Sequence, residues 1–177
     1  MAEIKSAIEI AMERTRGLRL SAEEKDKLKE EEFESRAHAL VNRFLGVDLH
    51  FREVARDLEK YSSEQRARLE KIMIQDLAAA LSLDRDNDLI FQGIDILAPE
   101  KKGVVPKVRE LAEAYRREKE KVLRETGEII RSRWQSLGVS GSAVVPKVAE
   151  SPEYAEALKA FRPSYEARLQ SLRDEIR

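Results

Sequence analysis

Large apolar side chains recur along residues 152–177 at intervals of three and four residues. They are Tyr154, Leu158, Phe161, Tyr165, Leu169, Leu172 and Ile176. This spacing is close to the 3.5-residue mean of a coiled coil, and it predicts one long helix with an apolar seam. The pattern keeps its phase across Pro163, so we expect this proline to kink one helix rather than to separate two. Because burial of each such side chain contributes roughly 1.5–3 kcal/mol, we expect the seam to be covered by protein.

A second long helix is expected from about Pro106 to Leu137, just before Gly138. Its apolar positions are Val108, Leu111, Tyr115, Val122, Thr126, Ile129, Ile130, Trp134 and Leu137. The charged run 116–121 interrupts this stripe, so we expect the middle of the helix to be its most exposed part. The two helices are predicted to form an antiparallel hairpin through the connector 138–151. A second subunit is the other candidate for covering the seam.

The only tryptophan, Trp134, lies close to Arg131 and Arg133 near the end of the long helix. Tryptophan and arginine are favoured at binding hot spots. The other interpretation is that Trp134 closes the end of the hairpin. The candidate interaction residues are Tyr154, Leu158, Phe161, Tyr165, Leu169, Leu172 and Trp134.

The pentapeptide Val-Val-Pro-Lys-Val occurs twice, at Val104–Val108 and Val144–Val148. The first copy begins the long helix and the second comes just before the last helix. A duplicated unit would explain the repeat, but the residues that follow the two copies align poorly. Independent helix starts of similar sequence, or valines lying along the side of the long helix, are the alternatives.

The rest of the chain predicts a compact helical module over residues 1–98. Good helix formers dominate, while glycine (7 residues) and proline (5 residues) are scarce. We expect helices over about 3–16, 21–45, 48–61, 64–82 and 88–97, with capping boxes at Ser21–Glu24 and Ser62–Gln65 and a cap at Asp48. Residues 99–103 form a linker and residues 104–177 the hairpin. The predicted fold class is all-α, a bundle of short helices with a long, coiled-coil-like C-terminal hairpin.

Composition excludes several kinds of chemistry. The chain has no cysteine, which rules out disulfides, thiolate zinc sites and cysteine nucleophiles. Its net charge of −1 gives no general attraction to nucleic acid or to an anionic membrane. The first residues do not resemble a signal peptide, and no stretch approaches the roughly 20 apolar residues of a membrane span. We expect a cytoplasmic protein that uses no cofactor and contacts no membrane.

Three local motifs resemble known ligand-binding sites in part. Asp84, Asp86 and Asp88 alternate as in a calcium loop, but Leu89 stands where that loop needs glycine, so a solvated cap explains them better. The two histidines, His38 and His50, lack a metal-binding spacing. The glycines of residues 138–141 close a helix rather than open one, which is typical of a flexible corner and not of a phosphate loop.

The long helix has a basic excess, with eleven Lys or Arg against seven Glu in residues 100–133. Nucleic-acid-binding helices usually gather such charges on one face. Here acidic and basic residues alternate at helical spacing, which is typical of an exposed, soluble rod. We therefore expect no nucleic-acid partner, and keep nucleic-acid association through this helix as a second alternative.

The sequence thus favours a non-enzymatic helical protein that acts as an interaction scaffold or an oligomer. Its expected partner is protein, either a second copy or a client, and a homo-oligomer is the favoured form. The first alternative is an enzyme or ligand-binding bundle with a site near His38 and His50. No motif identifies a family, a catalytic residue or a metal ligand.

Overall fold

A computed structural model describes residues 21–46, 50–139, 141 and 145–177, and every regular element in these ranges is helical. The α-helices are α2 (Ala22–Leu45), α3 (Phe51–Leu58), α4 (Ser63–Ala80), α5 (Asp88–Leu97), α6 (Val104–Ser136) and α7 (Pro152–Ile176), with short 3-10 turns at Pro99–Lys101 (η1) and Val148–Glu150 (η2). The predicted all-α fold is confirmed. The helix expected over 3–16 and the cap expected at Asp48 lie outside the described residues.

Helix starts follow the short-range signals of the sequence. Ser21 and Glu24 form a complete capping box at α2, and Ser62 and Gln65 form another at α4. The Ser151 side chain caps α7, with Pro152 in the first turn. Helix α6 begins at Val104, two residues before the predicted proline.

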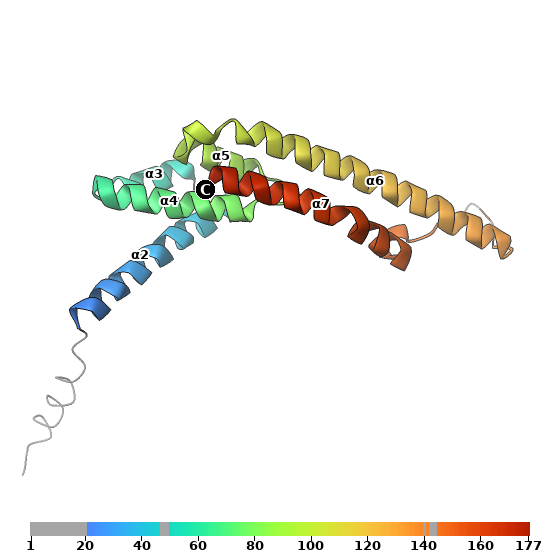
Figure 1. Ribbon diagram of the computed structural model, residues 1–177, viewed down its shortest axis with the longest axis horizontal. Coiled ribbons are helices and arrows are strands. Elements are labelled where there is room, and N and C mark those ends of the chain that lie inside the picture. The colour runs from blue at the N-terminus through green and yellow to red at the C-terminus, as the bar shows by residue number, and fades with distance from the viewer. Residues whose placement is uncertain (1–20, 47–49, 140, 142–144) are drawn as a thin grey trace, which may run out of the picture.

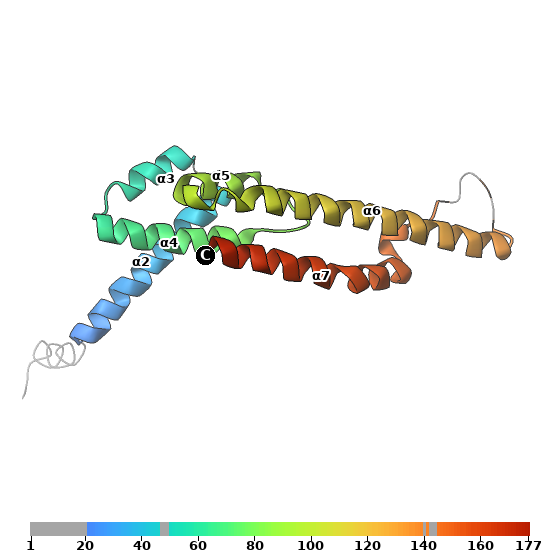
Figure 2. The ribbon, with the colours of Figure 1, turned by 45° about the horizontal axis from the view of Figure 1, so that its top comes forward.

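Helices α6 and α7 lie side by side and antiparallel, as the hairpin prediction requires (Figures 1 and 2). At one end, the Lys107 ammonium lies 2.9 Å from the Glu175 carboxylate. At the other end, Arg133 and Glu153 pair at 2.6 Å. Helix α7 continues through Pro163 without a break, which confirms that the seam belongs to one helix.

One hydrophobic core joins the short helices to the near half of the hairpin. Leu77 of α4 and Ile94 of α5 belong to the same buried cluster as Tyr115 of α6 and Leu169 of α7. This half of the hairpin is therefore a wall of the core. Whether residues 1–98 also fold without it stays a prediction. The start of α2 and the connecting end of the hairpin extend away from this core in different directions (Figures 1 and 2).

Candidate protein-interaction surface

The seam of α7 packs inside its own chain. Tyr154, Leu169 and Ile176 are buried, whereas Leu158, Phe161, Tyr165 and Leu172 are partly buried. Phe161 and Tyr165 both pack on the Tyr115 ring of α6, with ring centroids 5.7 and 5.4 Å away. The hairpin and the α4 region thus cover most of the seam, and little of it is left for a second protein. A role in binding a partner for the six of these residues other than Ile176 stays a prediction.

Asp84 ties the α4–α5 loop to both helices of the hairpin. One carboxylate oxygen of Asp84 lies 2.6 Å from the Lys119 ammonium of α6. The other carboxylate oxygen lies 3.0 Å from the Arg162 guanidinium of α7. The hydrogen bond from Lys119 is the main cause that lowers the pKa of Asp84, and the same bond raises the pKa of Lys119. This aspartate of the loop is thus held by two cations.

This tie corrects one expectation about α6. The charged run 116–121 does not form the most exposed stretch, because Lys119 is drawn onto the α4–α5 loop by Asp84. Beside it, the Tyr115 side chain is buried, and this burial raises the pKa of Tyr115. The near half of the hairpin is fixed by both apolar packing and charge.

Asp86, in the same loop as Asp84, accepts a hydrogen bond from the Asp88 backbone N–H at 2.8 Å.

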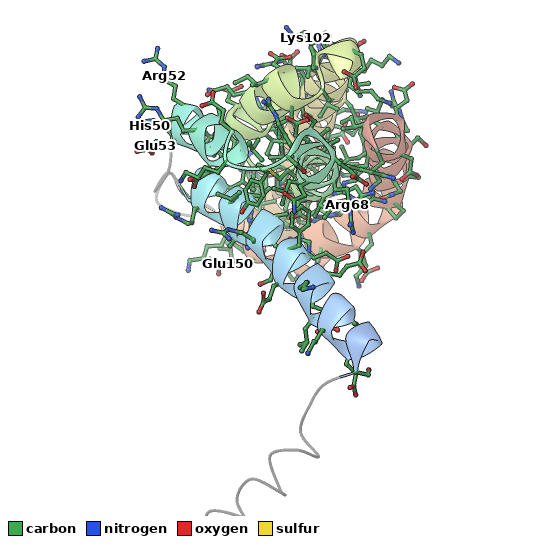
Figure 3. All side chains as sticks on the ribbon, turned by 90° about the vertical axis from the view of Figure 1, so that its left-hand side faces the viewer. His50, Arg52, Glu53, Arg68, Lys102 and Glu150 are labelled. Carbon is green, nitrogen blue, oxygen red and sulfur yellow. The ribbon has the colours of Figure 1, made fainter. Side chains whose placement is uncertain are left out.

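The two histidines belong to separate contacts. His38 of α2 lies 2.5 Å from the Asp76 carboxylate of α4 and helps to join these helices. His50 precedes α3, where its backbone N–H donates to Glu53 at 3.0 Å. Figure 3 shows His50 at the outer edge of the molecule with Arg52 and Glu53. His38 thus contacts a neighbouring helix, whereas His50 lies at the start of its own helix. The contacts of the two histidines do not form a shared site.

The connecting end of the hairpin ends in a Schellman motif. Gly138 adopts a φ of +77°, and its N–H donates to the Gln135 carbonyl, while the Val139 N–H donates to the Trp134 carbonyl. Trp134 is partly buried and lines a hollow with Ile130, Val145 and Pro146. Both interpretations of Trp134 stay open, because the ring helps to close the hairpin and also borders a surface hollow.

Apolar side chains are exposed mainly on this same half of the hairpin. Leu123, Ile129, Leu137, Val139 and Val145 are exposed, and we call this set the distal surface. Leu137 and Val145 have 71% and 76% of their surface exposed. Among the described residues, the other exposed large apolar side chains are Leu28 of α2 and Ile96 of α5, which lie on different elements.

Two residues of the predicted α6 stripe are therefore wrong as buried positions. Ile129 is 58% exposed beside the buried Ile130, because adjacent helix positions point about 100° apart and cannot both face the core. Leu137 is exposed because α6 reaches beyond the start of α7 (Figures 1 and 2).

The outer face of α6 keeps the alternation seen in the sequence. Arg117, Arg124 and Arg131 are exposed at seven-residue intervals, with Glu120 and Glu128 between them. This face therefore shows mixed charge rather than a basic stripe. Among the described helices, none is both long and apolar enough to cross a membrane.

Comparison with protein-family models, curated proteins and solved structures finds no match for this chain. The residues and their geometry are therefore the basis for a functional proposal.

Proposed function

We propose that this chain is a helical protein–protein interaction scaffold that presents the distal surface to a protein partner. The observation that carries the proposal is the clustering of exposed apolar side chains on the far half of the hairpin. Single exposed apolar residues are normal on protein surfaces, whereas five of the seven exposed large apolar side chains among the described residues lie on this one half of the hairpin. Leu137, Val139 and Val145 are in contact with water. Their burial by a partner would therefore contribute favourable free energy to binding.

The near half of the hairpin supports this role mechanically. Asp84 holds both helices at the level of Lys119 and Arg162, and the shared core buries the residues beyond that level. The distal half is thus attached to a near half that is held in place by packing and ion pairs. A partner that docks on a surface of this kind loses less conformational entropy than one that must order a loose segment.

The test compares a full-length variant that changes the distal surface with one that changes another exposed apolar site. Leu137→Glu with Val145→Glu places two charges on the distal surface, and Ile96→Glu is the matched control on α5. Each immobilised protein is incubated with native extract, and self-association is measured separately by sedimentation. We expect the double variant to lose a specific protein partner by about tenfold or more, while the control keeps it. Equal behaviour of the original chain, the double variant and the control would contradict the proposal.

A further inference from the structure

We propose that a second copy of this chain binds the distal half of the hairpin, packed antiparallel along one flank of α6 about a two-fold axis at Ile129, one residue of the distal surface. This inference rests on the proposed function and names its occupant. The residues along that flank of α6 are, in order, Val122, Glu125, Ile129, Arg133 and Ser136. We call this set the Ile129 flank.

The Ile129 flank occupies one side of α6. Its intervals are three, four, four and three residues, which keep side chains on the same side of a helix. Val122 is partly buried and the other four residues are exposed. Ile129 is the most exposed isoleucine of the described chain, at 58%. A second helix can therefore approach this side without displacing α7 from its own seam.

The residues of the flank are spaced symmetrically about Ile129, and the two charged residues on either side of it have opposite charges. In an antiparallel pair, residues at equal distances on either side of the two-fold axis face each other. Glu125 lies four residues before Ile129 and Arg133 lies four residues after it. A second copy therefore places each Glu125 opposite the other copy's Arg133, and the two Ile129 side chains meet at the axis. Val122 and Ser136, seven residues away on each side, face each other as well.

The charged groups of the flank are available for this pairing. Glu125 has no ion-pair partner within the described ranges. Arg133 contacts Glu153 through one terminal nitrogen, at 2.6 Å, which leaves further N–H donors on its guanidinium. One arginine can thus bridge a carboxylate of its own chain and one of the second copy, and this geometry favours the antiparallel sense over the parallel one.

The axis at Ile129 also limits the overlap to the distal halves. Residue 119 of one copy is then level with residue 139 of the other, so the shared cores remain apart. A contact of this extent belongs to the small interfaces, and such interfaces are generally weak. The expected species is a reversible dimer whose population rises with concentration.

Disulfide trapping tests the axis directly, because the natural chain has no cysteine. Full-length Ile129→Cys is oxidised under mild conditions, beside Ile96→Cys as the control of similar exposure, at 53%. Two cysteines on a two-fold axis between packed helices lie within reach of a disulfide. We expect a covalent dimer from Ile129→Cys and monomer from Ile96→Cys. Equal yields from the two variants, or none from Ile129→Cys, would overturn the proposed axis.

Charge reversal tests the pairing. Glu125→Arg places arginine opposite the other copy's Arg133 twice, so we expect dimerisation to weaken by about tenfold or more. Glu128→Arg makes the same change on another side of α6 and should leave dimerisation within about twofold. Sedimentation equilibrium of both variants gives the two dissociation constants. A dimer that is equally sensitive to both changes would contradict the pairing.

The two proposals fail differently. A chain that stays monomeric at high concentration, yet loses another protein when Leu137 and Val145 become glutamate, overturns the second copy and keeps the scaffold function. A chain that neither dimerises nor loses a partner through those changes overturns both. Circular dichroism of each variant confirms that the helices are retained before either result is interpreted.

Discussion

At the scale of single residues, Asp84 has the clearest energetic role. We expect Asp84→Asn to lower the free energy of unfolding by about 1–2 kcal/mol at neutral pH, because Lys119 and Arg162 lose a charged acceptor. Thermal or urea unfolding measures this loss. Asp86→Asn is the control, since its side chain accepts from a backbone N–H and an amide oxygen can do the same.

The pH dependence of this loss has a definite sign. The folded protein lowers the pKa of Asp84, so the unfolded chain takes up a proton first as the pH falls. The stabilisation is complete above the unfolded pKa, about 4, and it is lost as the pH falls through the folded pKa. The stability difference between the original chain and Asp84→Asn should therefore be constant from about pH 5 to 8 and shrink toward zero in stronger acid. A difference that grows on acidification would contradict the tie.

Two glycines provide a matched pair at the same scale. Gly138 has a φ of +77°, so Gly138→Ala should cost about 1 kcal/mol through backbone strain. Gly103 has a φ of −62° and open space around its Cα, so Gly103→Ala should stabilise the chain by about 0.4–1 kcal/mol. Opposite shifts of the melting temperature are the expected result. Shifts of the same sign would show that the Schellman motif does not fix the end of α6.

At the scale of the elements, the seam and the distal surface should respond differently to the same truncation. Leu169 is fully buried, so Leu169→Ala should destabilise the protein by about 2–5 kcal/mol. Leu137 is mostly exposed, so Leu137→Ala should change stability by less than about 0.5 kcal/mol. Urea unfolding of the two variants gives both numbers. A large loss from Leu137→Ala would mean that the end of α6 packs inside the chain.

The helices themselves were predictable from short-range chemistry. The capping residues Ser21, Ser62 and Ser151 set three helix starts, and the seam showed that α7 continues through Pro163. Both signals depend on neighbours within four residues. The seam also required a protein cover, and the antiparallel hairpin was the favoured one.

The long-range contacts were not predictable in the same way. Asp84, Lys119 and Arg162 meet because the α4–α5 loop lies against the hairpin, and no local pattern in the sequence specifies that meeting. Ile129 and Ile130 both fit the apolar stripe of α6 in the sequence, and only the packing shows which of the two faces inward. The candidate surface is therefore defined by exposure in the folded chain, and most side chains of the predicted interaction residues pack within the chain.

At the scale of the whole molecule, the hairpin divides at the level of Asp84 into a near half that completes the core and a distal half that does not. Lys119 and Arg162 mark this level, since both contact Asp84. The buried hairpin residues on the core side of that level that belong to the shared cluster are Val104, Val108, Leu111, Tyr115, Leu169 and Ile176. The distal half holds the exposed apolar residues.

This division predicts that the distal half can be removed without loss of the fold. A chain in which residues 123–158 are replaced by a short glycine–serine turn retains Asp84, Lys119, Arg162 and the whole shared cluster. We expect it to unfold cooperatively, with the Asp84→Asn effect intact, because the closing loop adds only a modest entropic cost. It should be monomeric and unable to retain any partner of the full chain. Sedimentation, urea unfolding and the binding assay check these three expectations, and a shortened chain that still associates would place the contact surface on the core instead.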